Sequence, residues 1–214
     1  MSGKRRGLFI SFEGGDGAGK SSQIGRLADH LRRLGMTVRV TREPGGSDGA
    51  EAIRALLVQG KAERWSPMAE ALMMYAARAD HLERLIRPAL DRGEAVITDR
   101  FADSTMAYQG IAGDLGETAV NTLHALVVGA TNPDITIILD APVSIALARA
   151  GDRGAHESRF ESKGEAYQEK VRQAFLKIAR ENPRRCVVID ATPDEESVFK
   201  VVAAAVEKTL QSRQ

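Results

Sequence analysis

Gly14-Gly-Asp-Gly-Ala-Gly19-Lys20-Ser21 lies between a short apolar run at residues 8–12 and a stretch whose apolar residues recur at helical spacing. It matches G-x-x-x-x-G-K-[ST], a pattern in which glycines let the backbone wrap a phosphate chain closely enough for amide N–H groups to point inward. The N-terminus of the next helix and the ammonium group of Lys20 add positive charge. The segment therefore predicts a loop, between a strand and a helix, that binds the phosphates of a nucleotide.

The contacts expected from this loop extend over the whole segment. We expect the phosphates to be held by Gly14, Gly15, Asp16, Gly17, Ala18, Gly19, Lys20, Ser21 and Ser22. The hydroxyl of Ser21 is expected to bind a Mg²⁺ ion that bridges phosphate oxygens, with Ser22 as the weaker alternative. The loop by itself does not distinguish a kinase from a GTPase, a motor or an adaptor.

Short apolar runs and helical patterns alternate along the rest of the chain. Strands are predicted at residues 8–12, 37–41, 95–98, 135–139 and 186–189. Helices are predicted at 20–34, at 50–58 and over a longer stretch, 66–91, which Ser66 caps and Pro88 bends near its end. Five apolar strands separated by helices predict an α/β fold of the P-loop NTPase type, with a doubly wound five-stranded parallel sheet and helices on both faces. We expect a single domain over residues 1–214.

Composition and charge limit the classes of partner. The 30 Lys and Arg residues against 29 Asp and Glu leave a net charge of +1, which is no electrostatic footprint for nucleic acid or an anionic membrane. The single cysteine, Cys186, excludes an intramolecular disulfide and lies in an apolar run typical of a buried strand. Too few apolar residues follow the basic start for a signal peptide, and no apolar stretch approaches the roughly 20 residues of a membrane span. We expect a cytoplasmic protein with small-molecule ligands.

Three segments outside the loop carry a family resemblance: Thr41-Arg-Glu-Pro-Gly-Gly46, Tyr75-Ala-Ala-Arg78-Ala-Asp-His81 and Asp99-Arg100-Phe-Ala-Asp-Ser104-Thr105-Met-Ala-Tyr108-Gln109-Gly110. With the loop, and in the same order along essentially the whole chain, they resemble the bacterial thymidylate kinase family. The resemblance implies Mg²⁺-dependent transfer of the γ-phosphoryl group of ATP to dTMP, which yields dTDP and ADP in dTTP biosynthesis. It also implies a homodimer packed through long helices.

Asp99 and Arg100 follow the strand predicted at 95–98, at the edge of the sheet where open α/β folds bind ligands. The guanidinium fork of Arg100 suits a pair of phosphate oxygens, and the resemblance implies that it holds the 5′-phosphate of the acceptor for in-line attack. Asp16 matches an acidic residue that the family places near the acceptor sugar and phosphate. Because a carboxylate repels phosphate unless Mg²⁺ or Arg100 lies between them, we expect Asp16 to orient the acceptor rather than to act as a strong base.

The acceptor base is expected to lie against the long helix. The resemblance implies that Arg78 bonds a base carbonyl, while the residue four positions earlier, one turn away on the same face, stacks on thymine. That residue is Met74 here, with Tyr75 next to it, so either a thioether contact replaces the family's aromatic ring or Met74 belongs to the core. The resemblance assigns further acceptor contacts to Glu43, Arg54, Ser104, Thr105, Tyr108 and Gln109, with Tyr108 crowding the position of a ribose 2′-OH.

Residues 150–165 are polar, charged and interrupted by glycine, so we expect them to be mobile, and the resemblance implies that they form a lid over ATP. The resemblance implies that a lid arginine supplies the charge that the variable positions of the loop lack. Arg153 is the first candidate, and Arg159 is less favoured because Ser158 replaces the acid of the family's Asp-Arg-x-Glu ending. The resemblance also implies that residues 190–193 and Arg149 enclose the adenine.

Two other functions stay open on the residues alone. A P-loop kinase for another nucleotide or for a nucleoside would differ only in the acceptor pocket, where Met74 departs from the family pattern. A nucleotide-switched binding protein would need a guanine-reading Asn-Lys-x-Asp run, which the sequence lacks. The histidines imply no zinc site, because they share no ligand spacing: His30, His81, His124 and His156.

Overall fold

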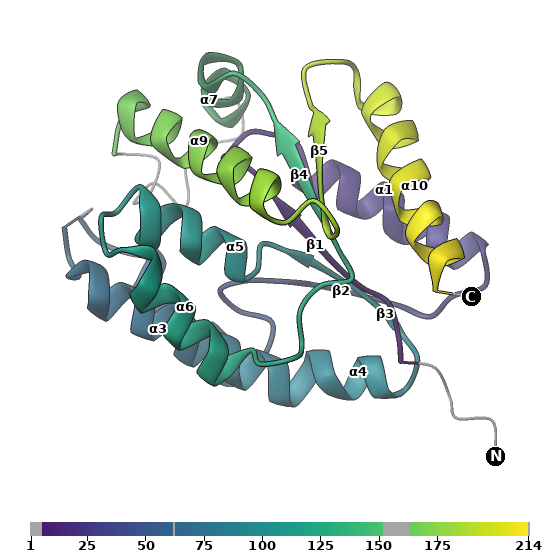
Figure 1. Cartoon of the computed structure of the whole chain (residues 1–214), viewed down its shortest axis with the longest axis horizontal. Coiled ribbons are helices and arrows are strands. Elements are labelled where there is room, and N and C mark those ends of the chain that lie inside the picture. The colour runs from purple at the N-terminus through teal and green to yellow at the C-terminus, as the bar shows by residue number, and fades with distance from the viewer. Residues whose placement is uncertain (1–5, 62, 152–162, 214) are drawn as a thin grey trace.

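The computed structural model describes residues 6–61, 63–151 and 163–213. Within these ranges the chain forms a sheet of five parallel strands in the order β2-β3-β1-β4-β5 (Figure 1). The strands are β1 (Phe9–Glu13), β2 (Val38–Arg42), β3 (Ala95–Asp99), β4 (Ile135–Asp140) and β5 (Cys186–Asp190). The predicted parallel sheet is confirmed, and each predicted strand differs from the observed one by a single residue at one or both ends.

The three inner strands, β1, β3 and β4, are buried on both faces because helices cover both faces of the sheet, whereas the edge strands β2 and β5 are partly exposed. In β1, Ile10 and Phe12 belong to the same buried cluster as Leu27, whereas Phe9 belongs to a second cluster on the opposite side. The Phe9 ring meets the ring of Phe101 edge to face, with centroids 5.0 Å apart. Successive side chains of β1 therefore pack into two separate cores, one on each face of the sheet, as in a doubly wound fold.

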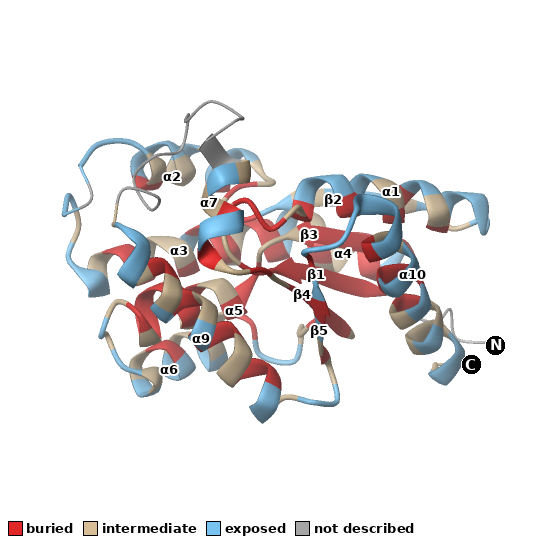
Figure 2. Cartoon of the chain, turned by 90° about the horizontal axis from the view of Figure 1, so that it is seen from above, coloured by how far each residue is buried: buried red, intermediate tan, exposed pale blue. Residues whose placement is uncertain are grey.

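Two helices cover one face of the sheet, α1 (Lys20–Arg33) and α10 (Glu195–Ser212). The opposite face carries α3 (Pro67–His81), α4 (Arg87–Asp91), α5 (Ala102–Thr105) and α9 (Glu165–Glu181), with α2 (Asp48–Val58) and α6 (Glu117–Val127) packed against α3. Buried residues concentrate on the strands and on the helix faces turned toward them (Figure 2). Among the described residues, no helix has both the length and the apolar character needed to cross a membrane.

The long helix predicted at 66–91 is interrupted in the structure. Ser66 caps it as predicted, since its side chain accepts from the N–H of Ala69. Between α3 and α4, however, the segment Leu82–Ile86 is π-helical, and the N–H of Arg87 bonds the carbonyl of Leu82, five residues back. Pro88 has no N–H to donate and its ring needs room in the preceding turn, which the wider π turn provides.

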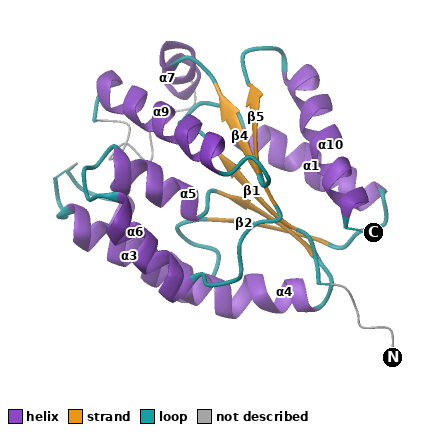
Figure 3. Cartoon of the chain, in the orientation of Figure 1, coloured by secondary structure: helices purple, strands orange, loops and turns teal. Residues whose placement is uncertain are grey.

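A second π-helical segment, Met106–Ile111, continues directly from α5. Together they form one continuous stretch of helix that follows β3 (Figure 3). Such segments are common at functional sites because the extra residue per turn re-aims neighbouring side chains. This one carries Tyr108 and Gln109, two of the residues that the sequence predicts to contact the acceptor.

Candidate active site

The glycine-rich loop lies between β1 and α1, as the sequence predicts. A Cβ atom on Gly17 would lie 1.8 Å from the carbonyl oxygen of Ala146, and the φ of Gly17 is +81°, so no other residue fits there without strain. Gly19 caps α1 without a side-chain hydrogen bond, and the first turn of α1 contains no acidic residue. The N–H groups of that turn are therefore not satisfied by a capping side chain, and the positive end of the helix dipole is not screened by a carboxylate.

Lys20 folds back over the loop that precedes it. Its Nζ donates to the carbonyl oxygens of Gly15 at 2.9 Å and Gly14 at 3.3 Å. Burial lowers the pKa of Lys20, and the nearby charge of Arg100 lowers it further. The ammonium group and the open end of α1 thus converge on the same space, which suits a chain of phosphates.

Oxygen ligands for a divalent cation lie beside the loop. The Ser21 hydroxyl donates to the carboxylate of Asp99 at 3.4 Å, so a hydroxyl and a carboxylate oxygen stand next to each other. Mg²⁺ prefers such hard oxygen ligands and is commonly held by one or two of them together with substrate phosphates. The two residues fit a Mg²⁺ site, for which the sequence predicted Ser21, with Ser22 as the weaker alternative, but not Asp99.

Arg100, at the carboxyl end of β3, centres one cluster of polar contacts. Its Nη2 donates to Asp16 at 2.6 Å and to the Tyr108 hydroxyl at 3.2 Å. Its Nη1 donates to the Gly14 carbonyl at 3.0 Å and to Ser104 Oγ at 3.1 Å. The Tyr108 hydroxyl in turn donates to Asp16 at 3.3 Å. We call Arg100, Asp16, Ser104 and Tyr108 the Arg100 cluster, and it lies directly against the phosphate loop.

The two charges of this cluster stabilise each other. Burial alone would raise the pKa of Asp16, but Arg100 and Lys20 outweigh burial and hold it below its usual value. Burial likewise opposes the charge of Arg100, yet Tyr108 and Asp16 keep its pKa well above the ordinary value. The lowered pKa favours the ionised form of Asp16 beside the Arg100 guanidinium.

Arg78, on α3, centres a second and more deeply buried cluster. Its Nε donates to Glu43 at 2.7 Å and its Nη2 to Thr105 Oγ1 at 3.0 Å. The guanidinium also lies over the rings of Tyr75 and Phe101, at 4.6 and 5.2 Å from their centroids. Its remaining nitrogen, Nη1, is buried and has no hydrogen-bond partner in the described part of the chain.

Behind Glu43 the polar contacts continue into the core. His81 is fully buried and bonds Glu43 Oε1 through Nδ1 at 3.0 Å and Thr41 Oγ1 through Nε2 at 2.7 Å. We call Arg78, Glu43, Thr105 and His81 the Arg78 cluster. Beside it, Gln109 Nε2 donates to buried Glu70 at 2.7 Å.

The sequence analysis missed the roles of Glu70 and His81. Both lie on α3 with Arg78, at separations of eight and three residues, which place all three on one side of the helix. Polar residues recurring on the buried side of an otherwise apolar helix were the signal that could have identified them.

Three other predicted acceptor residues are placed as follows. Met74 is half-buried, one turn before Arg78. Tyr75 is 2% exposed, and its hydroxyl donates to the Val120 carbonyl at 3.3 Å, so its ring belongs to the core beneath Arg78. Arg54 donates to the carbonyl of Pro44, the residue that follows Glu43, at 2.6 Å.

On the nucleotide side, Arg149 joins two segments distant in sequence. It lies in α7 (Val143–Gly151), and its guanidinium donates to the carbonyls of Ala191 at 2.8 Å and Thr192 at 3.3 Å. The residues predicted to enclose the adenine therefore lie together. Arg153 and Arg159, and most of the lid predicted at 150–165, lie outside the described residues.

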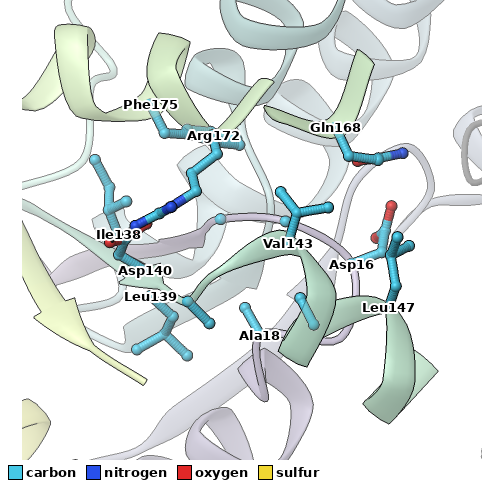
Figure 4. A pocket seen from close by; sticks show the side chains of 14 residues that line it. Asp16, Ala18, Ile138, Leu139, Asp140, Val143, Leu147, Gln168, Arg172 and Phe175 are labelled. Atoms are coloured by element: carbon cyan, nitrogen blue, oxygen red, sulfur yellow. Dashed lines mark hydrogen bonds and ion pairs between the residues drawn. The ribbon is translucent and has the colours of Figure 1, made fainter. Parts of the chain in front are cut away.

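A pocket opens between the phosphate loop and α9 (Figure 4). Asp16 and Gln168 lie at one end of it, and Asp140 and Arg172 lie at the other. Arg172 forms a two-point ion pair with Asp140, at 2.7 and 3.0 Å. The pocket adjoins the Arg100 cluster through Asp16, so space for a ligand continues from the loop toward α9.

Comparisons with known proteins agree with this geometry. A family model described as thymidylate kinase matches residues 12–202. Thymidylate kinase of Caulobacter vibrioides is 56% identical over 205 residues, which cover 96% of this chain and 98% of that protein. Thymidylate kinase of Dinoroseobacter shibae is 54% identical over 199 residues, covering 92% and 95%.

A solved structure gives the same result. The crystal structure of thymidylate kinase from Ehrlichia chaffeensis superposes with a TM-score of 0.75 at 34% identity, covering 94% of this chain and 99% of that one. The predicted P-loop NTPase fold is confirmed by this likeness. With the family model and relatives above 50% identity spanning nearly the whole sequence, the chain belongs to the thymidylate kinase family.

Proposed function

We propose that the Arg100 cluster and the Arg78 cluster hold the two ends of one dTMP molecule while the phosphate loop holds ATP. As a member of the thymidylate kinase family, the chain phosphorylates dTMP to dTDP and is an ATP-dependent nucleoside monophosphate kinase. Arg100 and Asp16 receive the acceptor 5′-phosphate, and Arg78 receives the base. Catalysis then comes from positioning and charge neutralisation, because the attacking phosphate is already ionised and needs no general base.

The observation that carries this proposal is the unpartnered Nη1 of Arg78. A buried donor without an acceptor costs about 1–3 kcal/mol, and more when it belongs to a charged group. Among the described residues, Arg78 Nη1 and Gln23 Oε1 are the buried side-chain polar atoms without a partner, and only the first is a donor. A carbonyl oxygen of thymine is an acceptor of the right kind to satisfy it.

The neighbours of Arg78 support a pyrimidine in this place. Thr105 Oγ1 already accepts from Arg78, so its own hydroxyl hydrogen can be given to a base carbonyl. Gln109 uses its amide nitrogen on Glu70, which leaves Oε1 as the atom that can accept the N3–H of thymine. Tyr108, which belongs to the Arg100 cluster, would crowd a ribose 2′-OH and favour the deoxy sugar.

On the donor side, the loop, Lys20 and Arg149 bind ATP, and Ser21 and Asp99 hold Mg²⁺. Mg²⁺, when bound there, would supply positive charge that offsets the negative charge of the phosphates. Lys20 adds its charge at the phosphates of ATP, and Arg100 adds its charge at the acceptor phosphate. We assign Arg153, in the proposed lid, the charge that reaches the transferring group when the lid closes and excludes water.

We also propose a homodimer of single-domain subunits in the cytoplasm. Exposed apolar side chains on neighbouring helices support the dimer: Met68 and Leu72 on α3 are 44% and 49% exposed, and Leu126 on α6 is 81% exposed. Sedimentation velocity at micromolar concentration should give a dimer, and Leu72→Glu should shift it toward the monomer. A wild-type protein that sediments as a monomer would contradict this part of the proposal.

The kinase proposal is tested by ADP release from the purified protein with Mg·ATP and a panel of acceptors. The panel holds dTMP, dUMP, dCMP, dGMP, AMP and shikimate, and the variants are Arg100→Ala and Arg84→Ala. Arg84 is a matched control, because it is an exposed arginine paired only with Asp80 among the described residues. We expect rapid turnover with dTMP, its loss in Arg100→Ala and its retention in Arg84→Ala. If no acceptor stimulated ADP release, the kinase proposal would be wrong, and a nucleotide-switched binding protein would be the favoured function.

A further inference from the structure

Glu13 is a charged residue at the end of an otherwise apolar strand. It is the last residue of β1, immediately before the phosphate loop, and it is fully buried. An ionisable side chain in such a place is expensive to bury unless its oxygens are bonded. Both oxygens of Glu13 are bonded, and both bonds go to the segment that begins with Arg100.

The first bond supports an unusual backbone conformation. Arg100 has a φ of +67°, in the left-handed region that side-chain-bearing residues rarely adopt. Its N–H donates to the Phe12 carbonyl at 2.9 Å, and its carbonyl accepts from Thr98 Oγ1 at 2.8 Å. The next N–H, that of Phe101, donates to Glu13 Oε1 at 2.8 Å. Glu13 therefore supplies one of three bonds that hold the chain in this conformation.

The second bond reaches the guanidinium of Arg100 through one intermediate. Ser104 Oγ donates to Glu13 Oε2 at 2.5 Å and accepts from Arg100 Nη1 at 3.1 Å. A guanidinium can only donate, so the hydroxyl hydrogen of Ser104 must point away from Arg100 and toward Glu13. Glu13 thus fixes the direction of the hydroxyl that holds the Arg100 side chain.

We propose that Glu13 is a positioning residue that sets both the backbone and the side chain of Arg100 for the acceptor phosphate. It does not touch the substrate. This inference rests on the proposed role of Arg100 in binding the 5′-phosphate of dTMP. Its consequence is specific, because Glu13 should matter for a ligand that carries the 5′-phosphate and not for the same ligand without it.

Glu13→Gln is the informative substitution because it preserves size. The amide offers one acceptor oxygen, so it can serve the Phe101 N–H or the Ser104 hydroxyl but not both. If the amide nitrogen of the glutamine faces Ser104, both this nitrogen and Arg100 Nη1 donate to Ser104 Oγ. The hydroxyl hydrogen of Ser104 then has lost the acceptor that Glu13 provided. The Arg100 side chain then loses its fixed position while the fold is retained. Glu13→Asp, which keeps the carboxyl group on a shorter side chain, is the rescue variant.

The experiment compares binding of dTMP with binding of thymidine by equilibrium titration, in wild type, Glu13→Gln, Glu13→Asp, Arg100→Ala and the double variant Glu13→Gln/Arg100→Ala. ATP affinity and the unfolding midpoint monitor the fold. Glu94→Gln is the matched control, because Glu94 is a buried carboxylate at the opposite end of β3 that pairs with Arg92 and Arg39.

We expect Glu13→Gln to weaken dTMP about tenfold, the loss of one hydrogen bond to a charged group, and thymidine less than twofold. Glu13→Asp should recover part of the dTMP affinity, and Glu94→Gln should leave both ligands unchanged. In the Arg100→Ala background, Glu13→Gln should have no further effect, since Glu13 acts through Arg100.

The failure of each proposal gives a different result. If Arg100→Ala leaves dTMP affinity unchanged, the proposed role of Arg100 is wrong and the role of Glu13 falls with it. If Arg100→Ala weakens dTMP but Glu13→Gln does not, only the inference about Glu13 is wrong. Equal weakening of dTMP and thymidine, or additive effects in the double variant, would show that Glu13 acts on the fold in general and would also overturn the inference.

Discussion

Arg100 and Arg78 both face the proposed acceptor site, but the protein immobilises them in opposite ways. Arg100 stands at a strand end with its backbone in the left-handed region, held by main-chain bonds and by Glu13. Arg78 lies in a regular helix, and only its side chain is fixed, by Glu43, Thr105 and two aromatic rings. One arginine is therefore positioned through its backbone and the other through its guanidinium.

This difference matches what each arginine is proposed to bind. The Arg100 cluster is partly open, since the side chains of Arg100 and Asp16 are 17% and 27% exposed, so a charged phosphate can enter and exchange contacts. In the Arg78 cluster, Arg78 and Glu43 are 2% and 4% exposed, and one donor is left to read a neutral base. The proposal thus assigns binding of the charged phosphate and recognition of the base to different regions, and the predictions below test that separation.

The largest effect is expected at the phosphate end. Arg100→Ala should lower kcat/KM for dTMP about a thousandfold, because it removes a charge that acts on the acceptor phosphate and leaves Asp16 without its partner. Steady-state kinetics with Mg·ATP in excess measures this. A loss smaller than tenfold would mean that the phosphate is held elsewhere.

At the base end the largest effect should be on stability. Arg78→Met should lower the free energy of unfolding by about 4 kcal/mol, since it leaves Glu43 buried without its cation. Arg100→Met should cost less, because water reaches the Arg100 cluster. Urea denaturation of both variants measures the difference. Adding Glu43→Gln should recover part of the loss in Arg78→Met, and equal losses at the two arginines would contradict the comparison.

The buried carboxylate behind Arg100 should make stability depend on pH. Burial raises the pKa of Glu13 from 4.5 to about 7, the like charge of Asp103 adds to this, and Ser104 and Arg100 oppose it. Lys20 and Arg185 are the other charged groups that interact with it.

With a raised pKa, the folded state holds a proton that the unfolded state releases between pH 4.5 and 7. Stability should therefore fall as pH rises through this window. Relative to Glu13→Gln, wild type should lose about 3 kcal/mol across it. Urea denaturation of both proteins at a series of pH values measures the difference, and a constant difference would contradict the prediction.

The smallest expected effect tests whether the backbone conformations of Arg100 and Arg78 differ as described. Because Arg100 is in the left-handed region, Arg100→Gly should be more stable than Arg100→Ala by about 1 kcal/mol. Arg78 is helical, so Arg78→Gly should be less stable than Arg78→Ala by about 1 kcal/mol. Unfolding free energies of the four variants measure this opposite order. The same order at both positions would show that the backbone of Arg100 is not strained.

Much of the fold could be predicted because its signals are local. The phosphate loop is one continuous pattern, and each strand is an apolar run whose bounds follow from neighbouring turns and helices. The π-helical segment at Leu82–Ile86 could not be predicted, because it depends on how the helix before Pro88 accommodates the sheet. Residues matched by motif, such as Arg100 and Asp16, were found to lie in direct contact.

The sequence did not predict the roles of four residues: Glu13, Asp99, Glu70 and His81. Their partners are distant in sequence: Glu13 bonds residues about 90 positions away, and Gln109 bonds Glu70 across 39. In the parallel pairing of β1 with β3, Phe12 stands beside Asp99, and this register brings Glu13 next to Arg100. This register cannot be predicted from the local sequence of either strand.

The sequence alone therefore determined the class of fold, the phosphate loop and the set of polar residues from which an acceptor site could be built. Their order along the chain and their periodicity are properties of short segments, which local sterics and hydrophobic burial decide. Only the tertiary structure decided which carboxylate supports which arginine, which donor stays unpartnered, and where the backbone is strained. Those outcomes depend on the packing of strands and helices against one another, because a buried polar group must find its partner among whatever the fold brings within hydrogen-bond distance.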